Sequence, residues 1–150
     1  MKTILAAIDF SDVTERVVQL ARDMARTHGA SLYLLHVEPP EPDFVGYGVG
    51  PQHVRDHVAR DAVLHFKEEN SLRNQLRDVG IDAHSLVLQG PVVDKILEEA
   101  ERLSADMIVM GSHGHGAVYH LLVGSVGEGV LMKSVCPVLI VPAHRGIRQD

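Results

Sequence analysis

The chain has 150 residues, 45% of them hydrophobic and 23% charged, and a net charge of −6 when its histidines are counted as neutral. This length and balance predict one domain over residues 1–150 and argue against a large nucleic-acid-binding surface. The single cysteine excludes an internal disulfide framework and fits a reducing compartment. The N-terminal apolar run is too short for a signal peptide, and no apolar run has the length of a membrane span. We therefore expect a cytoplasmic protein with no membrane span and no nucleic-acid partner.

Thr3–Asp9 is the first predicted element. It is a continuous apolar run closed by a carboxylate, which is typical of a strand buried on both faces. Ser11 and Asp12 are residue types that cap helices. The apolar positions of Val13–His28 recur near helical spacing, and Gly29 ends this predicted helix.

Ser31–Val37 is a second predicted strand, and the proline- and glycine-rich segment Glu38–Gly50 after it is predicted to be irregular. Pro51–Val79 is polar with a thin apolar stripe whose step changes near Asn70. This pattern predicts one long helix with an irregularity at that point. The stripe consists of Val54, Val58, Ala62, Phe66, Leu72, Leu76 and Val79.

The second half of the chain continues the alternation of strands and helices. Ile81–Gln89 has mixed faces, which favours an edge strand. A helix is predicted from Gly90-Pro91 to Leu103, with proline in its first turn. Asp106–Met110 and Pro137–Val141 are short apolar runs that predict the last two strands. Residues 144–150 form a polar tail that we expect to be frayed.

This alternation predicts an α/β fold, a parallel sheet with helices on both faces. In such sheets, ligands bind beyond the carboxyl ends of the strands. Asp9 ends the first predicted strand, and Gly111 follows the fourth. Both residues are therefore expected at the ligand-binding end of the sheet.

Glycines gather between the last two predicted strands. Gly111 and Gly114 are followed, nine residues later, by Gly124 and Ser125. We expect the first glycines to let the backbone turn off a buried strand, and any side chain at Gly124 to intrude on the site or to forbid the required φ. Gly124-Ser125 is predicted to open a helix, whose free N–H groups and dipole favour an anion. The pattern therefore indicates a phosphate-binding loop.

The spacing G-x-x-G-(nine residues)-G-[ST] resembles the nucleotide motif of the universal stress protein family. The resemblance extends to the opening ILAAIDFS, to Gly90-Pro91 before a helix, and to Cys136-Pro137 before the last strand. It implies a Rossmann-like fold of five parallel strands in the order 3-2-1-4-5. It also implies ATP or AMP as the ligand, with Mg²⁺ as a further candidate beside ATP, and a homodimer formed through Val138–Val141.

The resemblance, together with phosphate contact by the loop histidines His113 and His115, gives a set of nucleotide-binding residues. Asp9 matches the family's acidic residue after the first strand, and the backbone of Val37 matches the position that reads the adenine edge. The full set is Asp9, Ser11, Val37, Met110, Gly111, His113, Gly114, His115, Gly124, Ser125 and Val126. Two structural alternatives stay open: Asp9 as a carboxylate that braces its loop, and Ser125 with Glu128 as a capping box.

No lysine or arginine lies between Arg102 and Lys133, where many relatives place a basic residue. His113, His115 and His120 fall in this interval, either as solvated loop residues, as phosphate contacts or, least favoured, as metal ligands. Since no cysteine or carboxylate lies among them, no metal ligand is assigned. Gly127 and Gly129, inside the predicted helix, suggest close packing against the sheet.

The sequence therefore predicts a nucleotide-binding regulatory protein of the stress response that acts as a homodimer. The alternatives are a slow ATP hydrolase that uses the same cleft and an interaction module whose cleft stays empty. No catalytic residue is assigned, because no basic residue or obvious general base accompanies the glycines.

Overall fold

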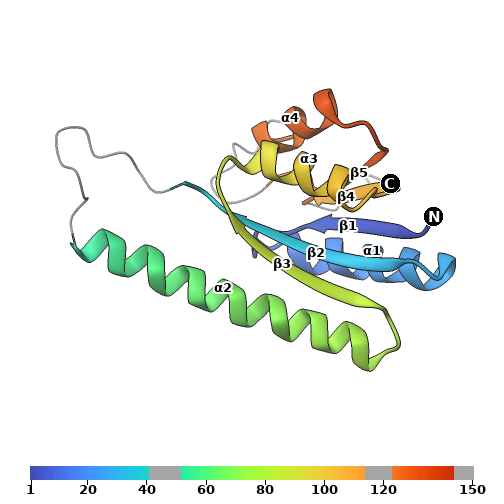
Figure 1. Ribbon diagram of the computed structural model, residues 1–150, viewed down its shortest axis with the longest axis horizontal. Coiled ribbons are helices and arrows are strands. Elements are labelled where there is room, and N and C mark those ends of the chain that lie inside the picture. Colours follow the sequence, from blue (N-terminus) through green and yellow to red (C-terminus); the bar gives the residue numbers. More distant parts are fainter. Residues whose placement is uncertain (41–51, 114–122, 144–150) are drawn as a thin grey trace, which may run out of the picture.

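Five parallel strands alternate with four helices in the computed structural model, which describes residues 1–40, 52–113 and 123–143 (Figure 1). The strand order is β3-β2-β1-β4-β5, so the predicted topology is confirmed. The elements are β1 Thr3–Ala7, α1 Thr14–His28, β2 Ser31–Glu38, α2 Gln52–Asp78, β3 Ala83–Gln89, α3 Val92–Arg102, β4 Met107–Gly111, α4 Ser125–Lys133 and β5 Val138–Val141. The predictions for residues 41–50 of the irregular segment, for Gly114, His115 and His120, and for the tail 144–150 lie outside the described residues.

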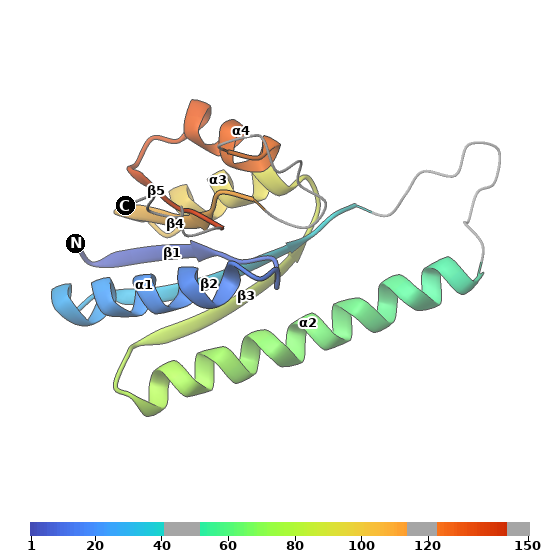
Figure 2. The ribbon, with the colours of Figure 1, turned by 180° about the vertical axis from the view of Figure 1, so that it is seen from behind.

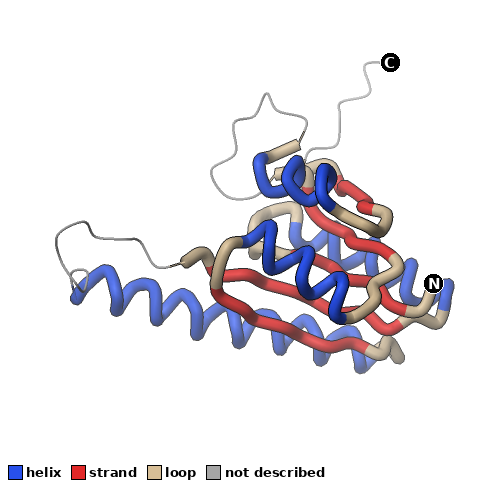
Figure 3. The backbone as a smooth tube through the Cα atoms, turned by 45° about the horizontal axis from the view of Figure 1, so that its top comes forward, coloured by secondary structure: helices blue, strands red, loops and turns tan. Residues whose placement is uncertain are grey.

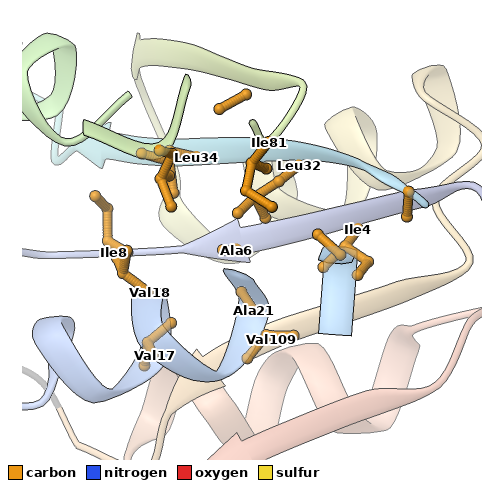
Figure 4. Packing of buried hydrophobic residues seen from close by; sticks show 14 of the residues in the cluster. Ile4, Ala6, Ile8, Val17, Val18, Ala21, Leu32, Leu34, Ile81 and Val109 are labelled. Carbon is orange, nitrogen blue, oxygen red and sulfur yellow. The ribbon is translucent and has the colours of Figure 1, made fainter. Parts of the chain in front are cut away.

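The helices form two layers, one on each face of the sheet. α1 and α2 cover one face, and α3 and α4 cover the other (Figures 1 and 2). Ile4, Ala6 and Ile8 pack in one cluster with residues of α1 and with Leu76 of α2. Figure 4 shows this cluster and labels Val17, Val18 and Ala21 of α1. Leu5 packs in a separate hydrophobic cluster, on the other face of the sheet, with residues of α3 and α4. β1 is therefore buried on both faces, as its unbroken apolar sequence predicts.

The carboxyl ends of β1 and β4 lie side by side, where the strand order reverses. Ala7 of β1 is paired with Met110 of β4 and with Leu35 of β2. β1 is two residues shorter than predicted, although the backbone N–H of Ile8 still donates to the Leu35 carbonyl at 2.9 Å. This arrangement places the loops after β1 and β4 next to each other, as the sequence predicts.

α2 differs from its prediction in two respects. It is continuous through Asn70, so the predicted irregularity is wrong. The predicted stripe is also wrong at Phe66 and Val79, which are 56% and 58% exposed. The inward line instead includes the polar residues His65 and Glu69, and it runs through Val58, Ala62, His65, Glu69, Leu72 and Leu76. These residues follow one another at steps of three and four, which is regular helical spacing. The apparent change of step arose because two inward positions are polar.

α2 also extends well beyond the sheet. Its N-terminal part projects past the carboxyl end of β2, and the residues of its first turns are largely exposed (Figures 1 and 3). Its C-terminal part packs on the sheet through Leu76, which is 4% exposed. β3 lies at one edge of the sheet, as predicted, and β5 lies at the other. No helix among the described residues is long and apolar enough to cross a membrane.

Candidate nucleotide-binding cleft

A cleft of about 430 Å³ lies at the carboxyl ends of the central strands. Its volume is in the range of small-molecule sites. Residues from both helical layers line it, with Val13 and Val17 from the side of α1, and Val92 and Ile96 from α3. The predicted site residues that line it are Asp9, Val37, Met110, Gly111, His113, Gly124, Ser125 and Val126.

Asp9 braces the loop that follows β1. Its Oδ1 accepts hydrogen bonds from the backbone N–H of Ser11 at 3.0 Å, from the Ser11 hydroxyl at 2.6 Å and from the Thr14 hydroxyl at 3.4 Å. Ser11 therefore supports the site through Asp9 and does not cap α1. The N-cap position of α1 is Val13, which makes no side-chain capping bond, so the prediction that Ser11 or Asp12 caps this helix is wrong.

Phe10, between Asp9 and Ser11, has a φ of 60°, in the left-handed region that non-glycine residues seldom occupy. Its ring is stacked on the His65 ring, with centroids 4.8 Å apart and planes 9° apart. It also meets the His36 ring edge-on at 4.9 Å. The turn after β1 therefore contacts both β2 and α2.

Gly124 holds the start of α4 against the end of β4. Its N–H donates to the Ser112 carbonyl at 2.7 Å. Its φ of −72° and ψ of 170° are extended values that any residue adopts, so the predicted need for a special φ is wrong. A Cβ on Gly124 would lie 3.4 Å from the Ser112 carbonyl oxygen, an ordinary contact. The backbone there tolerates a small side chain.

α4 begins without a side-chain cap. Gly124 occupies the N-cap position, and Ser125 is already the first helical residue. The capping-box interpretation of Ser125 and Glu128 is therefore wrong, because the serine lies one position too late. The N–H groups of the first turn line the cleft at Ser125 and Val126 without a side-chain acceptor at the cap. Uncapped first-turn N–H groups and the helix dipole favour an anion.

The glycines inside α4 make close contacts of two kinds. A Cβ on Gly127 would lie 2.6 Å from Cγ1 of Val123 and 4.0 Å from Cε of Met110 in β4. A Cβ on Gly129 would lie 2.9 Å from Cγ2 of Val93 in α3. The expected packing against the sheet therefore applies at most to Gly127, since Gly129 packs against α3.

His113 follows β4 at the edge of the described segment. Its Nδ1 lies 2.9 Å from the Ser112 hydroxyl, and that hydroxyl accepts a hydrogen bond from the Ala143 N–H at 3.0 Å. Its Nε2 is buried and has no hydrogen-bond partner among the described residues. His113 is therefore held against the start of the glycine-rich segment.

The sequence analysis missed a second group of polar residues on the cleft wall: His36 and Glu38 of β2 and His65 of α2. Burial raises the pKa of Glu38, but the hydrogen bond with His65 and the proximity of His36 outweigh burial and hold that pKa below its ordinary value of 4.5. Two sequence signals point to the group. Residues 36 and 38 are two apart in a strand, so they share a face, and His65 falls on the inward line of α2.

The described residues that line the cleft include no lysine or arginine. Their basic side chains are the histidines His36, His65 and His113. The sequence has no lysine or arginine near the glycines of the motif, and the described lining of the cleft has none either.

An open parallel sheet with helices on both faces and a cleft at its switch point defines a doubly wound α/β protein. The universal stress protein family model matches residues 1–142. The chain belongs to the universal stress protein family. It is 36% identical over 140 residues to a universal stress protein of Thermus aquaticus, covering 93% of this chain and 98% of that protein.

Solved structures show the same fold. Protein MJ0577 of Methanocaldococcus jannaschii superposes with a TM-score of 0.83 at 27% identity, covering 97% of each chain. A universal stress protein in complex with cAMP gives a TM-score of 0.70 at 23% identity, covering 95% of this chain and 98% of that one. An Archaeoglobus fulgidus universal stress protein in complex with dAMP gives 0.65 at 24% identity, covering 93% and 97%.

Proposed function

We propose that this protein binds an adenine nucleotide, ATP or AMP, in the cleft at the ends of β1 and β4. It acts as a nucleotide-responsive regulator in the stress response. The observation that carries the proposal is the uncapped start of α4, which lines the cleft. Family members in complex with cAMP and dAMP support an adenine nucleotide as the ligand class.

The phosphates bind at the start of α4, where no side chain caps the helix. The N–H groups of Ser125 and Val126 point their partial positive charge toward the helix start, beside Gly124. The adenosine part lies toward Asp9, in the loop that follows β1, and toward the backbone of Val37, near the end of β2. His113 and the residues of the glycine-rich segment, Gly114 and His115, complete the proposed phosphate site.

The lining chemistry favours binding over turnover. Efficient phosphoryl transfer requires positive groups that neutralise the charge that develops on the phosphoryl oxygens. The described lining offers histidines and helix N–H groups but no lysine or arginine. Slow hydrolysis of ATP in the same cleft remains the rival function, and an empty cleft in an interaction module is the third.

Nucleotide carried through purification separates the three functions. The protein is purified without added nucleotide and denatured, and the released small molecules are identified by mass spectrometry. Bound adenine nucleotide that is not turned over on incubation with ATP and Mg²⁺ supports the proposal. Accumulation of product supports the hydrolase, and a protein that neither carries nor binds nucleotide supports the interaction module.

Two substitutions at Gly124 test the position of the phosphates. Gly124→Ala adds a Cβ at an ordinary contact distance and is expected to bind ATP nearly as the wild type does. Gly124→Val adds bulk beside the first-turn N–H groups and is expected to weaken ATP by more than about tenfold, or about 1.4 kcal/mol. Calorimetry measures both affinities, and circular dichroism verifies the fold. Equal ATP affinity in all three folded proteins would show that the phosphates do not bind at the start of α4.

We also propose that the protein is a homodimer formed through β5. This strand is an outer strand of the sheet, where unpaired backbone groups favour a second strand. Apolar side chains shortly before it in the chain are exposed, namely Met132 at 79% and Val135 at 92%. A second copy, related by a two-fold axis beside β5, would cover the outer edge of this strand and the exposed apolar side chains with its own identical patch.

A further inference from the structure

Three potential metal ligands converge beside the cleft. His36, Glu38 and His65 each offer one ligand atom, and all these atoms lie within 4.8 Å of one another. His36 is 5% exposed, and the other two side chains are partly buried. This group comes from two elements that are far apart in the sequence, β2 and α2.

The fold determines this convergence. His36 and Glu38 lie two residues apart near the end of β2, so their side chains leave the same face of the strand. His65 lies on the inward line of α2, where the helix passes this end of β2. Phe10 packs against both imidazole rings and limits their movement. The three ligands are therefore held together without a metal ion.

The hydrogen bond of His36 determines the tautomer of its neutral ring. Its Nδ1 lies 2.9 Å from the Ile8 carbonyl oxygen, which can only accept, so Nδ1 carries a hydrogen. In the neutral ring, Nε2 then has a lone pair and no hydrogen. This is the arrangement found in metal-bound histidines, whose second nitrogen donates to a backbone carbonyl or carboxylate.

The lone pair of His36 faces another acceptor. Nε2 lies 3.0 Å from Oε1 of Glu38, yet this buried nitrogen makes no hydrogen bond among the described residues. The same carboxylate oxygen is in close contact with Nδ1 of His65. A neutral imidazole lone pair and a carboxylate oxygen repel at such a distance unless a cation or a proton lies between them.

We propose that His36, Glu38 and His65 form a binding site for one Zn²⁺ ion, through Nε2 of His36, the carboxylate of Glu38 and Nδ1 of His65. Two imidazoles and one carboxylate are a donor set that zinc accepts, with a fourth position left open. Mg²⁺ prefers oxygen ligands in an octahedron, so the site selects against it. The ligand residues also line the cleft, which places the open position where water or a phosphate oxygen can reach it.

The proposal requires no nucleotide. Its alternative is a protonated imidazole that pairs with Glu38 and leaves no place for a metal. Zinc supplied alone therefore tests the site even if nucleotide binding fails.

Zinc binding is measured on tag-free protein after dialysis against a chelator. Isothermal titration with ZnCl₂ is expected to show one equivalent bound, and titration with MgCl₂ is expected to show none. Co²⁺ in place of Zn²⁺ is expected to give the strong visible absorption of a low-coordinate ion with nitrogen ligands. Absence of zinc binding, or equal binding of magnesium, would overturn the proposal.

Matched variants locate the ligands. Glu38→Gln and His65→Gln each remove one donor and are expected to weaken zinc more than about 100-fold, beyond the loss typical of residues that only orient a ligand. His57→Gln is the control, because His57 and Asp61 form an exposed histidine–carboxylate pair on the same helix, 2.9 Å apart. It is expected to bind zinc as the wild type does. Unchanged affinity in the folded Glu38 and His65 variants, or loss of binding in the His57 variant, would refute the site.

Discussion

Val13 lies directly against Gly111, so that a Cβ on residue 111 would be 2.5 Å from Cγ1 of Val13. Val13 is 2% exposed and immediately precedes α1, and Gly111 ends β4. Gly111 does not have a positive φ, so its glycine is explained by this contact rather than by a special turn. The two loops at the ligand-binding end of the sheet are thereby packed against each other.

This contact predicts an energetic coupling between the two positions. Gly111→Ala is expected to lower the free energy of unfolding by about 1–3 kcal/mol, because the new methyl group overpacks the site. Combined with Val13→Ala, which removes the opposing methyl groups, it should lower stability by less than the sum of the two single changes. Urea denaturation of the four proteins measures this coupling. Additive effects would show that the contact is not what requires glycine.

Glu69 predicts a dependence of stability on pH. It is fully buried on the inward line of α2, where Oε1 accepts from the Leu86 N–H at 3.0 Å. Its Oε2 has no hydrogen-bond partner among the described residues. Burial raises the pKa of Glu69 from 4.5 to about 8, although the Leu86 N–H and the charge of Arg73 oppose the shift.

Between these two values the folded protein keeps a proton on Glu69 that the unfolded chain has released. The free energy of unfolding is therefore expected to fall as pH rises from about 5 to about 8, by at most about 1.4 kcal/mol per pH unit from this residue. Glu69→Gln should make that slope shallower, and Glu68→Gln, a change at an exposed neighbour, should not. Denaturation at several pH values measures the slopes. The same slope in both variants would show that Glu69 titrates normally.

The proposed dimer predicts the effect of a charge on an exposed residue. Val135→Asp places a carboxylate on a side chain that is 92% exposed, so the folded monomer has no reason to be destabilised. Light scattering at micromolar concentration should show a dimer for the wild type and a monomer for this variant. Val63→Asp, at an exposed apolar residue of α2, is the control and should stay dimeric. A monomeric wild type would contradict the proposal.

The strands show what the sequence could predict. All five strands were predicted. Continuous apolar runs indicated β1, β4 and β5, because burial on both faces leaves a plain pattern in the residues, and the mixed faces of Ile81–Gln89 indicated that β3 lies at an edge. The order of the strands came from the resemblance and is confirmed. Periodicity alone does not fix strand order, since it describes each strand and not its neighbours.

The errors have physical causes that involve tertiary contacts. The predicted apolar stripe of α2 leaves out His65 and Glu69, because polar residues are usually exposed, yet here β2 and β3 supply them with partners. Ser125 fits a capping pattern, but α4 begins one residue earlier than a serine cap requires. The need for glycine at position 111 depends on Val13, which is remote in sequence. Each case depends on a contact that local sequence does not contain.

The cleft takes its walls from both sides of the sheet, with Val13 and Val17 on one side and Val92 and Ile96 on the other. A molecule seated there touches the two helical layers at once, and its affinity depends on how far apart they lie. Linkage is reciprocal, so occupancy must bias that separation by the same free energy. The outer surfaces of α1 and α3, which lie on opposite faces of the sheet, would then both respond to the same bound molecule. A partner on either surface could read the occupancy of the cleft without reaching into it.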